Sequence, residues 1–159
     1  DTFMARGQYH QAAVCYAAWV RVDPNNKKLK AELDDAMAKA KVALAETKKA
    51  LAATEKWLVL LDEGKYAETW DQSAGVFRKN SAKKQWAVTL KGLLGSLGKM
   101  KSRVKQDADY RTSLPGGPNG QYVVFTFKTV YANKPNTIET VTPMKDKDGK
   151  WRVSGYYIK

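Results

Sequence analysis

Residues 26–63 read NKKLKAELDDAMAKAKVALAETKKALAATEKWLVLLDE, and neither proline nor glycine occurs between Pro24 and Gly64. Alanine, lysine, glutamate and leucine, which are strong helix formers, fill most of this stretch. Apolar or small residues recur at alternating steps of four and three, namely at Leu33, Met37, Ala40, Leu44, Thr47, Leu51, Thr54, Leu58 and Leu61. This seven-residue repeat predicts one helix of roughly 55 Å, because each residue adds about 1.5 Å. The helix would join an N-terminal helical part to a C-terminal α+β domain.

The alanines and threonines of the repeat make it shallow, which suits close packing against another helix. Three partners are open at this point. The segment 3–22 could fold back on the long helix, a second copy of the chain could pair with it as a homodimer, or the stretch could be a solvated spacer.

A second helix is expected over residues 3–22, where Ala5, Ala12, Ala13, Tyr16, Trp19 and Val20 recur at helical spacing. Asp23-Pro24-Asn25-Asn26 ends it, because proline disfavours helix in the residue before it. Gly7, Tyr9, Ala12, Tyr16 and Pro24 have the spacing of the second helix and terminal proline of a tetratricopeptide repeat, and residues 7–26 resemble part of that motif. The resemblance implies stacked helical neighbours, since one such repeat cannot bury its own face.

After Gly64, a natural helix C-cap, the pattern changes from helices to strands. A short helix is expected over 65–72 and a longer one from a Ser81 cap to about Leu97, followed by strands over 101–112, 123–131, 137–144 and 151–158. The first strand alternates charged residues from Lys101 to Arg111, Arg103 among them, which predicts one solvated side. Val123, Phe125, Phe127, Thr129 and Tyr131 are expected on one inward face. The predicted class is α+β, with helices packed on a curved four-stranded antiparallel sheet.

Several motifs of the C-terminal part occur in a fixed order: WLVLLDEGKYAETWD from Trp57, then QWAVTL, SLPGGPNGQYVV, ETVTPM and WRVSGYY. Together they resemble an uncharacterised bacterial family, a domain of unknown function, over about residues 51–159. We therefore expect a helical part at 1–50 and an α+β domain at 51–159. The resemblance implies a small bacterial protein of the cell envelope or periplasm and implies no activity. The layout is similar to the cone-shaped nuclear-transport-factor-2-like and cystatin-like folds.

The formal charge of +12 is concentrated in the second part of the chain, and no acidic residue lies between Asp71 and Asp107. The candidate contacts for a polyanion are Arg78, Lys79, Lys83, Lys84 and Lys91. Such a field could attract nucleic acid, anionic lipid or an acidic protein. The alternative is a solvated lysine face, since lysine outnumbers arginine and arginine is the better reader of phosphates.

Catalytic and metal-binding patterns are scarce. The single histidine, His10, lies outside the expected α+β domain, which excludes a Ser-His-Asp or Cys-His arrangement within that domain. No cluster has zinc or calcium spacing, and Asp146-Lys147-Asp148-Gly149 is typical of a hairpin turn. We expect no cofactor and no metal, and Cys15 is expected to pack among alanines.

An aromatic set remains as a candidate ligand cavity, made of Trp70, Asp71, Trp86, Tyr110, Phe127 and Tyr156. In a cone-shaped domain such residues can line a concavity, and Asp71 beside Trp70 could then be a general base. The alternative is ordinary core packing, which aromatic residues at helical and strand spacing usually serve.

We therefore predict a non-enzymatic binding or scaffolding protein that contacts protein partners through its helical part. Polyanion binding and a small-molecule or enzymatic cavity near Trp70 and Asp71 are the alternatives. No apolar run reaches the roughly 18 residues of a membrane-spanning helix. The chain begins at Asp1 without methionine, so a processed product is expected.

Overall fold

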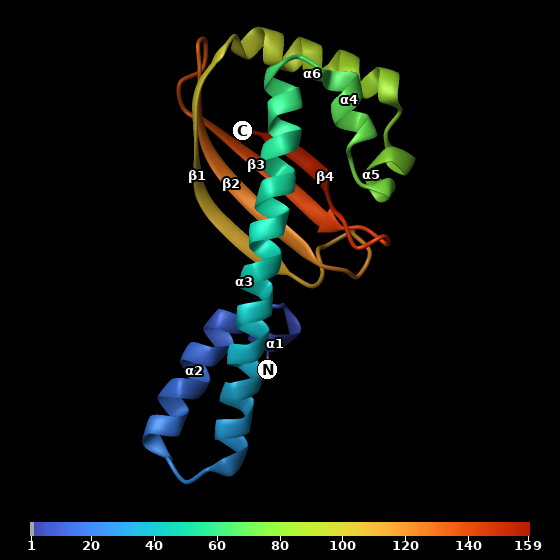
Figure 1. The fold of residues 1–159 in the computed structure, drawn as a ribbon. Coiled ribbons are helices and arrows are strands. Elements are labelled where there is room, and N and C mark those ends of the chain that lie inside the picture. Colours follow the sequence, from blue (N-terminus) through green and yellow to red (C-terminus); the bar gives the residue numbers. More distant parts are fainter. Residues whose placement is uncertain (1) are drawn as a thin grey trace.

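The longest element of the computed structural model, which describes residues 2–159, is helix α3 (Lys27–Asp62). It runs through both parts of the molecule (Figure 1). The Asn26 side chain caps its first turn and accepts a hydrogen bond from the Leu29 N–H at 3.2 Å. Gly64, with φ of +74°, ends it, and the N–H groups of Gly64 and Lys65 donate to the Leu61 and Leu60 carbonyls. Both predicted boundaries are confirmed, because each follows from a capping residue.

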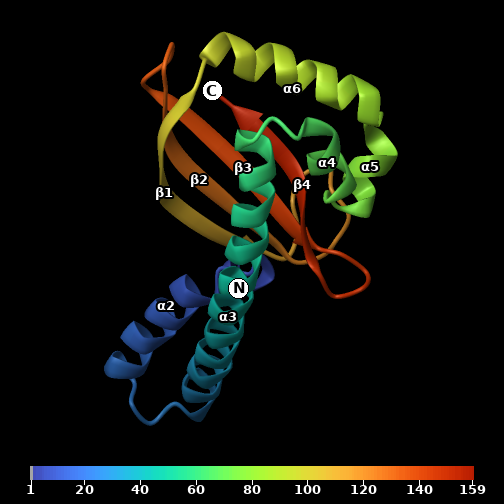
Figure 2. The same ribbon diagram turned by 45° about the horizontal axis from the view of Figure 1, so that its top comes forward.

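The N-terminal part is a helical hairpin in which α2 (Tyr9–Val22) lies beside the first half of α3 (Figures 1 and 2). The fold-back of this segment on the long helix is therefore confirmed. A separate short helix, α1 (Thr2–Ala5), precedes it. One continuous helix over 3–22 is wrong, because Gly7 has φ of +76° and breaks the chain between α1 and α2.

The predicted repeat of α3 is buried in its last part, at Thr54, Leu58 and Leu61, but in the first half of the helix the buried stripe lies one residue earlier. Ala36, Ala43, Ala50 and Trp57 are buried at seven-residue spacing, whereas Met37 and Leu44 are exposed. Ala36 packs with Ala12 and Tyr16 of α2 in a small cluster of its own. Small side chains at this contact let the two helices approach closely.

The C-terminal part is an antiparallel sheet with the strand order β1-β2-β3-β4. Its strands are β1 (Met100–Arg111), β2 (Tyr122–Tyr131), β3 (Thr137–Lys145) and β4 (Trp151–Ile158). All five side chains predicted on the inward face of β2 are at most 5 % exposed. The α+β class and the four strands are confirmed.

Helices cover the inward face of this curved sheet (Figures 1 and 2). The second half of α3 crosses it, α6 (Lys83–Leu97) runs over one end, and α4 (Tyr66–Asp71) and α5 (Gly75–Asn80) lie beside them. The main core joins Trp57, Leu58 and Leu61 of α3 to Leu90 of α6 and Phe125 of β2. Within residues 2–159, no helix combines the length and the apolar character that crossing a membrane requires.

Strand β1 differs from its predicted pattern. The expected solvated side includes Arg103, yet that side chain is only 9 % exposed and points into the sheet domain. The pairing of β1 with β2 shifts register between Met100 and Ser102 and again between Lys105 and Asp107. Such irregularities break strict alternation, so the prediction of one fully solvated side is wrong at Arg103.

Two fully buried threonines provide a matched test of the core. The Thr54 hydroxyl on α3 has no hydrogen-bond partner among the described residues. The Thr69 hydroxyl donates to the Tyr66 carbonyl at 2.7 Å and accepts from the Trp86 indole N–H at 2.9 Å.

We expect Thr54→Val to raise the free energy of unfolding by about 1 kcal/mol, since it removes an unpaired buried hydroxyl. Thr69→Val should lower it by about 1–3 kcal/mol. Urea unfolding followed by tryptophan fluorescence measures both changes. Equal destabilisation by the two variants would contradict the absence of a hydrogen-bond partner for the Thr54 hydroxyl among the residues described.

Candidate functional site

The six residues of the candidate aromatic cavity lie in three places. Trp70 and Asp71 are on α4, and Trp86 on α6 approaches them through its hydrogen bond to Thr69. Phe127 belongs to the main core, and Tyr156 lies against Trp57 with ring centroids 5.3 Å apart. Tyr110 lies far along β1, close to Tyr9 of the hairpin. Trp86, Tyr110, Phe127 and Tyr156 all belong to the main core or pack against it, as the core-packing alternative expects, and the ligand cavity stays a prediction.

Trp70 and Asp71 instead meet two of the candidate polyanion contacts. Lys83 forms an ion pair with Asp71 at 2.6 Å, and Arg78 and Lys83 both lie about 6 Å from the centre of the Trp70 ring. The Trp70 indole N–H donates to the Ser81 carbonyl at 2.7 Å. Asp71 thus has a cationic partner at an exposed corner between α4 and α6.

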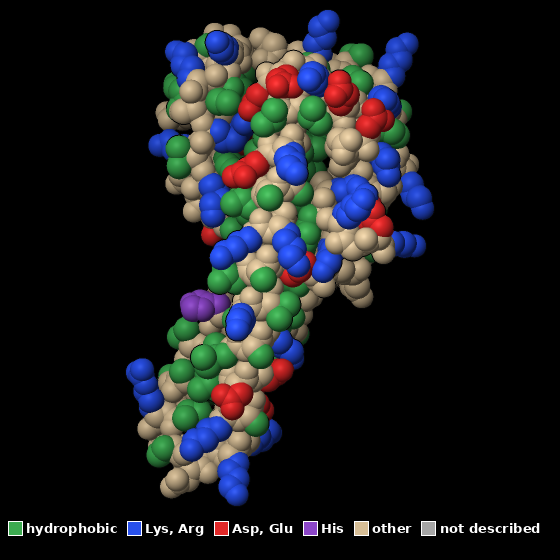
Figure 3. All heavy atoms as spheres, viewed as in Figure 1, with side chains coloured by type: hydrophobic (Ala, Val, Ile, Leu, Met, Phe, Trp, Pro, Cys, Tyr) green, Lys and Arg blue, Asp and Glu red, His purple; other side chains and the backbone are tan. Residues whose placement is uncertain are grey.

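Lys79, Lys84 and Lys91 are the remaining candidate polyanion contacts, and all three are exposed. Lys84 and Lys91 are seven residues apart on α6 and therefore share a face. Lys79 lies on α5. Figure 3 shows Lys and Arg side chains spread over the whole visible face, with acidic side chains between them. Polyanion binding by these residues stays a prediction.

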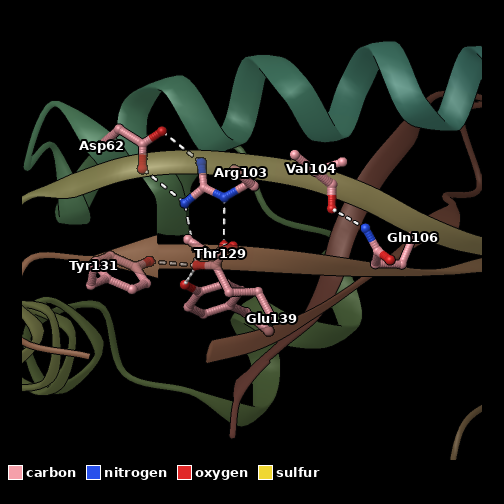
Figure 4. A network of polar contacts seen from close by, with 8 residues as sticks. Asp62, Arg103, Val104, Gln106, Thr129, Tyr131 and Glu139 are labelled. Carbon is pink, nitrogen blue, oxygen red and sulfur yellow. Dashed lines mark hydrogen bonds and ion pairs between the residues drawn. The ribbon is translucent and has the colours of Figure 1, made fainter. Parts of the chain in front are cut away.

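A buried carboxylate is the most connected polar group of the sheet domain. Glu139 on β3 is fully buried, and Arg103 of β1 lies between it and Asp62 at the end of α3 (Figure 4). Arg103 donates to Glu139 at 2.5 and 3.2 Å and to Asp62 at 2.7 and 2.9 Å. Forked pairing of this kind fixes orientation as well as charge.

Three hydroxyl groups complete the surroundings of Glu139. Thr129 and Tyr131 of β2 each donate to it at 2.6 Å, and Tyr156 of β4 donates at 2.5 Å. Burial alone would raise the pKa of Glu139, but the Arg103 guanidinium and these donors hold it below its ordinary value. The carboxylate is therefore a charged junction of α3 and all four strands, with both oxygens occupied.

A second carboxylate holds the middle of α3. Glu46 is buried and accepts hydrogen bonds from the Trp151 indole at 2.9 Å, from Lys145 at 2.8 Å and from Lys49 at 2.6 Å. Lys145 and Trp151 flank the turn between β3 and β4. Hydrogen bonds from Lys145 and Lys49 lower the pKa of Glu46 to about 2, against an ordinary value of 4.5.

Two of the hollows along α3 bear on the candidate sites. The first, of about 470 Å³, lies between the start of α2, the middle of α3 and β1, and Tyr110 and His10 line it. The second is larger, about 830 Å³, and lies between α3, α4 and the β3–β4 turn. Of the six predicted cavity residues, only Tyr110 lines either hollow.

Exposed apolar side chains gather on the hairpin. Val14, Trp19 and Val22 of α2 and Met37, Val42 and Leu44 of α3 are each more than half exposed. Figure 3 shows hydrophobic side chains along this hairpin, which projects away from the sheet domain. Met37 and Leu44 share one face of α3, and neighbouring exposed apolar side chains on a projecting element are typical of an interaction surface.

The hairpin is anchored to the sheet domain at one end. The Tyr9 and Tyr110 rings lie 6.1 Å apart, and the Thr112 hydroxyl donates to the Ala5 carbonyl at 3.3 Å. A side chain at Gly7 would lie 3.1 Å from the Thr112 backbone nitrogen, so glycine permits this close approach.

Sequence reasoning missed the three anchored carboxylates and the larger hollow. Glu46 and Asp62 look like ordinary exposed acids of a helix, and Glu139 like a polar residue of a strand. The only available signal was the inward alternation of β3, which places Glu139 on the same face as Val141.

The resemblance of the C-terminal part to a domain of unknown function is confirmed by comparison with known protein families. The model of a family described as a protein of unknown function (DUF4019) matches residues 53–156. No curated protein matches the chain. The tetratricopeptide-like segment lies outside the matched residues, and that resemblance stays a prediction, as does a bacterial envelope location.

The depressed pKa of Glu46 predicts a pH-dependent stability. A carboxyl whose pKa is lower in the folded chain stabilises it above the unfolded pKa, and this contribution is lost as the pH falls toward the folded value. The free energy of unfolding should therefore fall between pH 4.5 and about pH 2 in the wild type.

In Glu46→Gln this part of the pH dependence should be absent. The difference in free energy of unfolding between wild type and Glu46→Gln should therefore shrink as the pH falls. Urea unfolding at a series of pH values measures it. Glu55→Gln, an exposed position of the same helix, is the control and should change stability by less than about 0.5 kcal/mol. Parallel pH curves for wild type and Glu46→Gln would contradict the anchoring of Glu46.

Proposed function

We propose that this chain, which belongs to the DUF4019 family of proteins of unknown function, is a non-enzymatic binding protein whose α2–α3 hairpin contacts a protein partner. The observation that carries the proposal is the exposed apolar surface of the hairpin. Met37 and Leu44 are 57 % and 60 % exposed, and they share one face of α3 because they are seven residues apart.

The construction of the hairpin supports this role. Its own cluster consists of only Ala12, Tyr16 and Ala36, with Met4, Ala13, Leu29 and Leu33 packed against it. A pair of helices with so small a shared core gains stability from further helices on its flanks, as the units of helical repeats do. The expected partner therefore supplies a helix with apolar residues that cover Met37 and Leu44.

The carboxylates named above are already paired, which favours binding over catalysis. Glu139 and Glu46 each accept several hydrogen bonds, and Asp71 forms an ion pair with Lys83. A general base needs a free oxygen within reach of the substrate proton. Carboxylates held in this way stabilise the fold and position the helix.

The double variant Met37→Glu/Leu44→Glu tests the proposal. Both side chains are exposed, so stability should change by less than about 1 kcal/mol in total. Val88→Glu on α6 is the matched control, since Val88 is 60 % exposed and lies outside the hairpin. A protein retained by immobilised wild-type chain should be retained by the control and lost with the double variant.

Calorimetry with the purified partner should then show a dissociation constant at least about tenfold higher for the double variant, a loss of about 1.4 kcal/mol. Sedimentation of the wild type over a range of concentrations shows whether that partner is a second copy of the chain. Equal binding of wild type and double variant would overturn the hairpin as the interface.

A further inference from the structure

The larger hollow is a groove of the sheet domain between α3, α4 and the β3–β4 turn, and no residue of α2 lines it. Ala53, Lys56 and Leu60 of α3 form one wall, Glu68 and Gln72 form another, and residues 149–153 close it. Its volume of about 830 Å³ lies within the roughly 300–1,000 Å³ of sites for small organic molecules. Figure 3 shows hydrophobic side chains between Lys and Arg side chains on this side of α3.

The floor of the groove is apolar. Trp57, Trp151 and Val153 are buried there, and Ala53 and Leu60 are half-buried beside them. Both indole N–H groups point to protein acceptors: Trp57 donates to the Thr69 carbonyl at 2.8 Å, and Trp151 donates to Glu46 at 2.9 Å. The rings therefore offer apolar surface to the groove, since their polar atoms are already paired.

The rim of the groove is cationic. Lys49, Lys56, Lys150 and Arg152 line it, against Glu68 as the one acidic lining residue. Lys49 pairs with Glu46, and Arg152 pairs with Asp146 and Asp148. Neither Lys56 nor Lys150 forms an ion pair with a carboxylate of residues 2–159. Within the described residues Lys56 thus has no carboxylate partner beside the apolar floor, and the ammonium group of Lys150 acts on Asp148 only at longer range.

We propose that this groove binds an amphipathic organic anion. The apolar body of the ligand lies on the Trp57 and Trp151 floor, and its carboxylate, sulfonate or phosphate is bound by Lys56 and Lys150. Such a ligand matches the apolar floor and the cationic rim together, because an apolar chain alone would leave the two ammonium groups without an anion and a small inorganic anion would leave the floor uncovered. The site is separate from the hairpin surface.

Dodecanoate is the test ligand, and the dye 1-anilinonaphthalene-8-sulfonate is the reporter. Wild-type chain should bind the dye saturably, with one site, and dodecanoate should displace it. Binding should also change the tryptophan emission, since Trp57 and Trp151 lie at the floor. Dodecanol, which lacks the charge, should displace the dye at least about tenfold more weakly.

Two pairs of variants locate the site on α3. Ala52→Phe narrows the groove and Lys56→Glu reverses the charge at its rim, and each should weaken dodecanoate binding at least about tenfold. Ala45→Phe and Lys48→Glu make the same changes at exposed positions of α3 outside the groove lining, and should leave binding within about twofold. Met37→Glu/Leu44→Glu should leave it unchanged as well, which separates this proposal from the hairpin interface.

Vesicles of phosphatidylglycerol distinguish a free ligand from a membrane surface. If the chain binds such vesicles, and Lys56→Glu weakens this binding while Ala52→Phe does not, the charges act on a surface and the groove proposal fails. It also fails if wild-type chain shows no saturable binding of the dye or dodecanoate, or if the control variants lose binding as much as the groove variants.

Discussion

Two carboxylates of one helix hold α3 on the sheet. Glu46 is bound by Lys145 and Trp151 at the β3–β4 turn. Asp62 is bound by Arg103, which also forms an ion pair with Glu139. The two carboxylates are sixteen positions apart, which is roughly 24 Å of helix. Breaking one partner of a buried pair is costly because it leaves an uncompensated charge, so these contacts specify where the helix lies.

This anchoring divides α3 into two parts with different roles. Beyond Glu46 toward Asp62, one side of the helix packs on the main core, and the cationic groove forms along its flank beside α4. Before Glu46, the helix leaves the sheet and packs mainly on α2. The same element thus supplies the wall of one proposed site and the exposed face of the other.

The sequence predicted features that depend on local physics. Asn26 and Gly64 mark the ends of α3, and the alternation of β2 gives its inward face, because capping and pleat are properties of adjacent residues. Features that depend on register or on distant segments were missed. Arg103 turns inward where β1 has irregular pairing with β2, and the groove combines residues of α3, α4 and β4 that lie about a hundred positions apart in the chain. The spacing of the candidate aromatic residues likewise does not say whether each side chain fills the main core or lines a cavity, and four of the six lie in or against that core.

Hydrogen exchange along α3 measures whether its anchored and projecting halves are one helix with unequal support. Amides of residues 50–62 should exchange as slowly as those of β2, because they open only with the whole sheet domain. Amides of residues 27–40 should be protected but exchange faster, since only the small cluster with α2 holds them. Unprotected amides around Glu46, or one uniform rate along the whole helix, would contradict this account.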